Sequence, residues 1–304
     1  MGDASRAATT APAAPAPGDL TAAYRAEAGH TGRAEIKFAR AAGRTFIARQ
    51  RIAYPFHLTR PFYRDRCTPG LLTVYLQSVS GGLYEGERVG VALHASAGAQ
   101  VHLTSQGSTV VHTMVADEAR HDVTIEATAD SLVEYVPDPL ILFPAARLAN
   151  RVSVVAAEGA RVIVADAFHA HDSAGGEGGA RPFSRLISEL RVARPDGRLV
   201  CLDRFDLDGT AWAAGTPGIA TSAGGQASLV VLDPADPAAL VQGLAKALEP
   251  IPNLYASASV IPGEGGAWAR LLAGDGIALR AGVTAAWVAA RTHLTGAAPA
   301  LHRK

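Results

Sequence analysis

The sequence predicts a mainly β protein with a few α-helices near its C-terminus, and three observations carry this prediction. Between residue 30 and about residue 232, apolar and polar residues alternate in many short runs, as they do in half-buried β-strands. Clusters of glycine, proline, serine and aspartate separate these runs and indicate turns. In the last third of the chain the apolar residues instead recur at helical spacing.

The alternation is clearest in three segments. Apolar side chains occupy every second position at Ala34, Ile36 and Phe38, at Val89, Val91 and Leu93, and at Val123, Ile125 and Ala127. Further β-rich runs lie at 71–79, 109–115, 131–136, 161–168, 184–192 and 198–204. We therefore expect many short strands in this part of the chain.

Two helices are expected after residue 235. Asp236 and Pro237 combine an N-cap residue with proline at the first helical position, and leucines follow every four residues until Pro250. A second helix is expected at about 283–292, with Val283, Trp287 and Arg291 on one face. The Gly/Ala/Thr/Ser-rich segment 213–226 is predicted to be a loop.

Composition limits the possible classes of protein. Of the 304 residues, 48% are hydrophobic and 18% charged, which is enough apolar material for a sizeable core. Lys+Arg and Asp+Glu both total 28, so nucleic acid or an anionic membrane is not expected to be the main partner. No run approaches the roughly 18 apolar residues of a membrane span.

The two cysteines, Cys67 and Cys201, cannot form a disulfide framework, and a reduced cytoplasmic protein is the simplest interpretation. The Ala/Pro/Thr-rich residues 1–28 are expected to form a disordered tail. We expect residues 29–304 to form a single domain.

The best metal-binding candidate lies after the run at 161–168. His169 and His171 would point to the same side of a strand, and Asp172 and Glu177 follow, so nitrogen and oxygen donors suited to nickel, zinc or iron lie close in sequence. Asp166, three residues before His169, is a further candidate donor in this group. The favoured alternative is that these are solvated residues at a strand boundary, because no second histidine motif completes a closed site.

Residues 137–143 combine two prolines around an aspartate with a following apolar run. Prolines exclude a central strand at their own positions and favour a rigid bend. The segment is either a core strand entered through that bend or an apolar patch for a partner. The candidate partner-binding residues are Pro137, Asp138, Leu140, Ile141 and Phe143.

Four motifs in register resemble those of one family. They read RPFY at residues 60–63, SGGLYEGE at 80–87, LTSQGST at 103–109 and EYVPDPLILF at 134–143. In order and spacing they are similar to the motifs of the urease accessory family UreD, also called UreH, over roughly residues 30–205. The family's Gly-Asp stands here as Gly86-Glu87, which keeps the carboxylate, whereas the family's lysine after the third motif falls at Val110. In the later Gly-Arg-x-x-x-Gly-Glu motif, His171 and Asp172 replace Gly-Arg, and Gly176-Glu177 matches Gly-Glu.

This resemblance implies a β-rich, β-helix-like scaffold flanked by C-terminal helices. It implies a non-enzymatic accessory protein that binds apo-urease and UreF-like and UreG-like proteins and assists nickel insertion, with nickel bound only transiently and no tightly held cofactor. Glu87 and Glu177 match the family's carboxylates, and with His169, His171 and Asp172 they are the residues expected on a weak nickel path.

Two other functions stay open from the residues alone. A cupin-type β-barrel metal enzyme would use His169, His171 and Glu177, although it needs a further histidine on a facing strand and the next is His293. An all-β interaction protein with no role in metal transfer would also explain the strands and the apolar patch.

Overall fold

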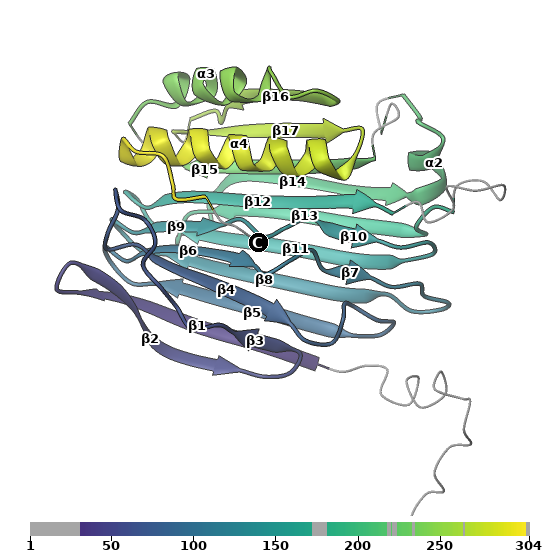
Figure 1. The fold of residues 1–304 in the computed structure, drawn as a ribbon, viewed down its shortest axis with the longest axis horizontal. Coiled ribbons are helices and arrows are strands. Elements are labelled where there is room, and N and C mark those ends of the chain that lie inside the picture. The colour runs from purple at the N-terminus through teal and green to yellow at the C-terminus, as the bar shows by residue number, and fades with distance from the viewer. Residues whose placement is uncertain are drawn as a thin grey trace, which may run out of the picture.

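The computed structural model describes residues 31–171, 181–217, 220, 224–232, 235–263 and 265–301, and within them the strands form two sheets (Figure 1). Sheet A has seven strands in the order β14 (Leu199–Asp208), β13 (Arg185–Ala193), β11 (Arg147–Ala156), β8 (Ala119–Ala127), β5 (Arg88–Ala95), β1 (Thr31–Ala41) and β2 (Arg44–Ile52). Sheet B has ten strands, and its main path runs β16 (Leu254–Val260), β17 (Gly266–Ala273), β15 (Gly225–Leu232), β12 (Arg161–Ala170), β9 (Leu132–Tyr135), β6 (Gln100–Ser105), β4 (Leu72–Ser78) and β3 (Phe56–Leu58). The short β10 (Leu140–Leu142) pairs with β12 and with β7 (Val110–Val111).

The chain alternates between the sheets from β4 to β13. It passes from β4 to β5, from β6 to β8, from β9 to β11 and from β12 to β13, and neighbours in this part of each sheet are parallel. Each pair of crossings therefore adds one parallel strand to each sheet, which is the geometry of a β-helix. This architecture confirms the prediction of a mainly β, β-helix-like scaffold.

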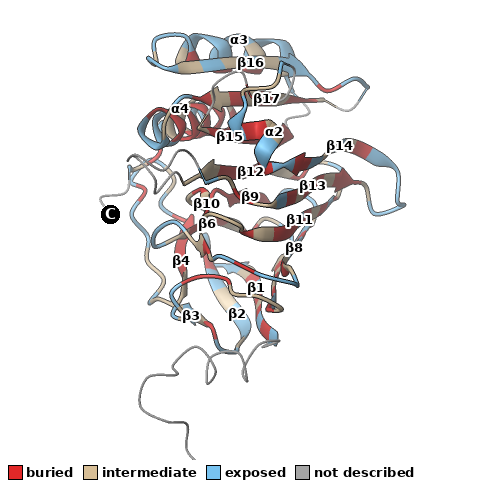
Figure 2. Cartoon of the chain, turned by 90° about the vertical axis from the view of Figure 1, so that its right-hand side faces the viewer, coloured by how far each residue is buried: buried red, intermediate tan, exposed pale blue. Residues whose placement is uncertain are grey.

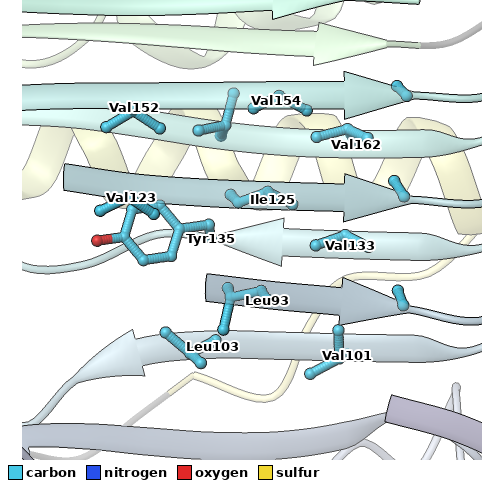
Figure 3. Close-up of a cluster of buried hydrophobic side chains, with 14 of the residues drawn as sticks. Leu93, Val101, Leu103, Val123, Ile125, Val133, Tyr135, Val152, Val154 and Val162 are labelled. Carbon is cyan, nitrogen blue, oxygen red and sulfur yellow. The ribbon is translucent and has the colours of Figure 1, made fainter. Parts of the chain in front are cut away.

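The inward faces of the two sheets form the main core. Side chains such as Val91 and Val152 from sheet A meet Leu103 and Val164 from sheet B, all nearly inaccessible to water. Figure 3 shows this layer of valine, leucine and isoleucine between the strands. The alternation read from the sequence exists because every second residue of these strands enters this layer, so more buried and more exposed residues alternate along strands such as β13 and β14 (Figure 2).

The described helices are α2 (Gly209–Ala213), α3 (Pro237–Leu248) and α4 (Gly276–Thr295). The carboxylate of Asp236 accepts a hydrogen bond from Ala239 N at 3.0 Å, as the N-cap motif predicted. α3 and α4 cover the outer face of sheet B near β15–β17 and bury Leu240, Leu244 and Leu248 together with Val283 and Trp287 (Figure 1). Both predicted helices are therefore confirmed, and α4 extends beyond the predicted bounds at each end.

Some predicted elements were wrong. Of the expected strand 109–115 only Val110–Val111 pairs, because the chain there crosses from one sheet to the other. The predicted loop 213–226 includes the start of β15, and β16 and β17 were not anticipated. The expected disordered tail, residues 1–28, lies outside the described residues.

Candidate functional site

All passages from sheet B to sheet A lie at one end of the molecule, because the strands they join are parallel within each sheet. We call this region the crossover end; it comprises residues 79–87, 106–118, 136–146 and the described parts of 171–184. The glycine turn, the residues after Ser105 and the Pro-Asp-Pro segment, far apart in sequence, are neighbours here. The fold thus brings three of the resembling motifs to one surface.

Backbone hydrogen bonds join successive crossovers. Leu83 N donates to Val110 O at 2.7 Å, Phe143 N to Val111 O at 3.0 Å, and His171 N to Leu142 O at 2.8 Å. The glycine turn comes very close to its neighbour: Gly82 has φ +146°, and a Cβ there would lie 2.4 Å from Val110 O. Only glycine fits this contact, which explains the glycine pair at residues 81–82.

A column of rings runs along the same crossovers. Tyr84 stacks on His112 with ring centroids 4.2 Å apart, His112 meets Phe143 edge-on at 5.6 Å, and Phe143 stacks on His171 at 4.7 Å. These four side chains are half-buried. They give the crossover end a partly apolar surface.

Glu87 is buried at this end, immediately before β5. Its carboxylate accepts a hydrogen bond from Tyr84 N at 3.0 Å, and its own backbone N–H donates to Tyr84 O at 3.1 Å. The side chain therefore holds the glycine turn closed. This contact gives the retained carboxylate a structural role, whereas its place on a nickel path stays a prediction.

His169 lies near the end of β12, and His171 lies just beyond it. Burial lowers the pKa of His169, and the nearby His171 lowers it further, so the neutral imidazole that binds metals is favoured. Asp172 and Glu177 lie outside the described residues. Within the described ranges, no three His, Cys, Asp or Glu side chains are close enough to hold a metal ion.

Asp166 does not join these histidines, contrary to its grouping with them from sequence. It points between the sheets, where Asn150 Nδ2 donates to Asp166 Oδ1 at 2.8 Å and Ser188 donates to the other carboxylate oxygen. His169 lies three residues later and so on the opposite face of β12, beside Gly276 at the start of α4.

Hydrogen bonds from the backbone of residues 137–143 hold this segment against the neighbouring crossover. Asp138 N donates to Ser105 Oγ at 2.8 Å and Ile141 N to Thr109 O at 2.9 Å, and Leu142 is buried. The structure therefore favours a short strand entered through a rigid bend. Leu140, Ile141 and Phe143 remain half-buried, so a partner-binding role for the exposed parts stays a prediction.

Sequence reasoning missed a polar cluster in the interior. Around Asp166 lie Asn150, Ser188 and His121, and His121 Nδ1 is 2.8 Å from Asn150 Oδ1. Burial raises the pKa of Asp166, as does the negative charge of Asp203, while the Ser188 and Asn150 hydrogen bonds oppose the rise. Burial also lowers the pKa of His121.

A second carboxylate extends this cluster toward the helix-covered part of sheet B. Asp203 on β14 accepts hydrogen bonds from Ser228 on β15 and from Arg270 on β17. Strands of both sheets thus contribute carboxylates to one polar interior region. Among the described residues these groups are not close enough together to form a preformed metal site.

A cavity of about 60 Å³ lies beside Asp166. It is lined on one side by His121, Asn150 and Asp166, and on the other by Ser105, Thr109 and Asp138 at the crossover end. A cavity of this size holds a few water molecules when its walls carry polar groups. Its lining therefore includes both the interior carboxylate of Asp166 and residues of the motifs at the crossover end.

Another buried charge cluster ties α4 to sheet B. The Arg291 guanidinium donates two hydrogen bonds to the carboxylate of Glu134 and a third to Asp65 Oδ2 at 2.6 Å. The Glu134 carboxylate also accepts a hydrogen bond from Trp287 Nε1 at 2.9 Å, and His102 Nδ1 lies 2.8 Å from Glu134 Oε2. Burial acts to raise the pKa of Glu134, but the hydrogen bonds from His102 and Arg291 outweigh it and lower the pKa to about 2. The cluster fixes the helix on the sheet.

The sequence does contain a sign of both polar clusters, the one around Asp166 and the one around Glu134. Glu134 and Asp166 interrupt otherwise apolar strands, and a charged residue in such a run is buried only if it is paired. Their partners could not be named, because they come from strands or helices many residues away.

Taken together, these features define the class of the fold: two β-helix-like sheets with a polar interior, helices packed on one sheet and a surface of joined crossovers. The UreD urease accessory protein family model matches residues 30–304, and the chain belongs to this family. Its relatives are accessory proteins and not enzymes, which agrees with the prediction from sequence and rules out the cupin-type enzyme.

Individual relatives match along nearly their whole length. Urease accessory protein UreD 1 of Pseudomonas syringae pv. syringae is 38% identical over 273 residues, covering 89% of this chain and 95% of the relative. Urease accessory protein UreD 1 of Methylorubrum populi is 37% identical over 296 residues, covering 96% and 97%. Urease accessory protein UreD 2 of Streptomyces griseus is 35% identical over 265 residues, covering 86% and 89%.

No helix in the described part of the chain is both long and apolar enough to cross a lipid bilayer.

Proposed function

We propose that this chain is a scaffold of the urease maturation complex and assists the insertion of nickel into apo-urease. Its partners in this role are apo-urease and UreF-like and UreG-like accessory proteins. Membership in the UreD family supports the assembly role. The observation that carries the nickel role is the interior cavity that joins Asp166 to the crossover end.

The chemistry of the interior suits cargo in transit. Nickel accepts oxygen and imidazole ligands, and the cavity offers the carboxylates of Asp138 and Asp166, amide and hydroxyl oxygens and a histidine instead of a closed cage. A passage has to release the ion, so weak and exchangeable ligands are better suited than a rigid four-ligand site. We expect micromolar or weaker binding, about −8 kcal/mol or less favourable.

The assembly role is tested by co-expression. The chain, apo-urease and the UreF-like protein should co-purify as one complex, and urease from cells lacking the chain should contain little nickel. A chain that purifies alone and captures neither protein, or urease fully loaded without it, would refute the proposal. Capture of the partners with full nickel loading in its absence would instead support an interaction protein without a metal role.

A further inference from the structure

The positive charge of the chain is concentrated near the start of the described residues. Between Thr31 and Arg66 there are nine lysine and arginine residues and two acidic ones. Because the whole chain carries 28 of each, nineteen basic and twenty-six acidic residues remain elsewhere. The neutral total therefore conceals a basic region and an acidic remainder.

Strand pairing places four of these basic residues on one surface. Ala34, Ile36 and Phe38 of β1 enter the core, so Arg33 and Lys37 face outward from sheet A. Arg49 lies directly opposite Lys37 on β2, and Arg51 lies opposite Glu35. We call Arg33, Lys37, Arg49 and Arg51 the basic edge, since β2 is the terminal strand of sheet A.

The basic edge is poorly neutralised. Glu35 bonds Arg33 at 2.8 Å, but within the described ranges no carboxylate lies within ion-pair distance of Lys37, Arg49 or Arg51. On the other side of Lys37, His94 of β5 is already paired with Glu126 at 2.9 Å. Like charges directly opposite each other destabilise a sheet, so the Lys37–Arg49 pair is not explained by folding.

We propose that the basic edge is the docking surface for an acidic surface of a protein partner in urease maturation, an inference that rests on the proposed function. A partner's carboxylates would neutralise the repulsion between Lys37 and Arg49. The same pair that destabilises the free sheet would therefore stabilise the complex. The exposed Phe46, 42% accessible on the neighbouring part of β2, adds apolar contact area. A long nucleic acid fits less well, because it would extend from this small patch over the acidic remainder of the chain.

Charge reversal tests the inference with a matched control. Lys37→Glu/Arg49→Glu keeps a like-charged pair between β1 and β2, so it leaves the balance of cross-strand repulsion unchanged. Lys246→Glu/Arg280→Glu makes the same change in net charge at exposed positions of α3 and α4. Affinities of the full chain for purified apo-urease and for the UreF-like protein are measured at low and high salt, with melting temperatures recorded for both variants.

We expect the β1/β2 double variant to lose about tenfold or more in affinity for one of the two proteins, and the control variant to bind as the wild type does. The wild-type affinity for that protein should fall as salt rises. Equal binding by both double variants, or displacement of the partner by a single-stranded oligonucleotide bound at the basic edge, would overturn the inference alone. A wild-type chain that binds neither protein would overturn the proposed function as well.

Discussion

Glu134 is a buried carboxylate and Asp166 a half-buried one between the sheets, yet their surroundings move their pKa values in opposite directions. Glu134 has Arg291 and His102 as partners, and its pKa is lowered to about 2. Asp166 has only neutral donors, and burial raises its pKa. The first is therefore a structural anion, whereas the second keeps oxygen atoms that a passing cation could use.

The Glu134 cluster predicts a dependence of stability on acid pH. Because the folded pKa of Glu134 lies below its ordinary value of 4.5, its contribution is present above about pH 4.5 and is lost as pH falls toward 2. The loss should be on the order of 3 kcal/mol of unfolding free energy. Denaturant unfolding between pH 7 and pH 2 measures it.

Glu134→Gln is the matching variant. It leaves the Arg291 guanidinium buried without its full counter-charge, so we expect it to cost about 3–5 kcal/mol at pH 7 and to flatten the acid dependence. An unchanged acid slope in this variant would show that other carboxylates cause the pH effect.

The two histidines at the end of β12 give a second prediction at this scale. His169→Ala/His171→Ala should lower the nickel content of urease in cells without preventing complex formation, because neutral imidazoles bind nickel. Glu177→Ala should do the same. Full nickel loading in both variants would remove these residues from the nickel path.

At the scale of elements, alternation predicted most strands, since one face of each strand enters the layer between the sheets. β16 and β17 were not predicted, because about half of their residues are alanine, serine or glycine, and these leave little difference in hydrophobicity between the two faces of the strand. β7 and β10 are too short for any period to show. Which strands pair, and hence the cavity at Asp166, depends on contacts far apart in sequence that no local pattern reports.

The β10 segment gives a prediction about partners. Ile141 is half-buried, whereas the neighbouring Leu142 is 1% accessible and belongs to the core. Ile141→Ser should weaken capture of a maturation partner with little change in melting temperature. Leu142→Ala, in contrast, should cost about 2–5 kcal/mol of stability. If Ile141→Ser captures every partner as the wild type does, residues 137–143 serve the fold only.

At the scale of the whole molecule, the described strands form two sheets with helices packed on one of them, and the chain belongs to the UreD urease accessory protein family. The purified chain should hydrolyse neither urea nor GTP, as steady-state assays of ammonia and phosphate release can establish. Turnover that a point substitution in this chain abolishes would contradict its classification as an accessory protein.

We propose that nickel reaches urease by way of the interior beside Asp166. The most direct measurement is the nickel content of urease purified from cells that carry Asp166→Asn, which keeps the side-chain shape and removes the charge. Asp122→Asn, on the exposed face of sheet A, is the matched control. We predict an intact complex with a several-fold lower nickel content for Asp166→Asn and full loading for Asp122→Asn. Full loading in both would contradict a nickel path through the interior.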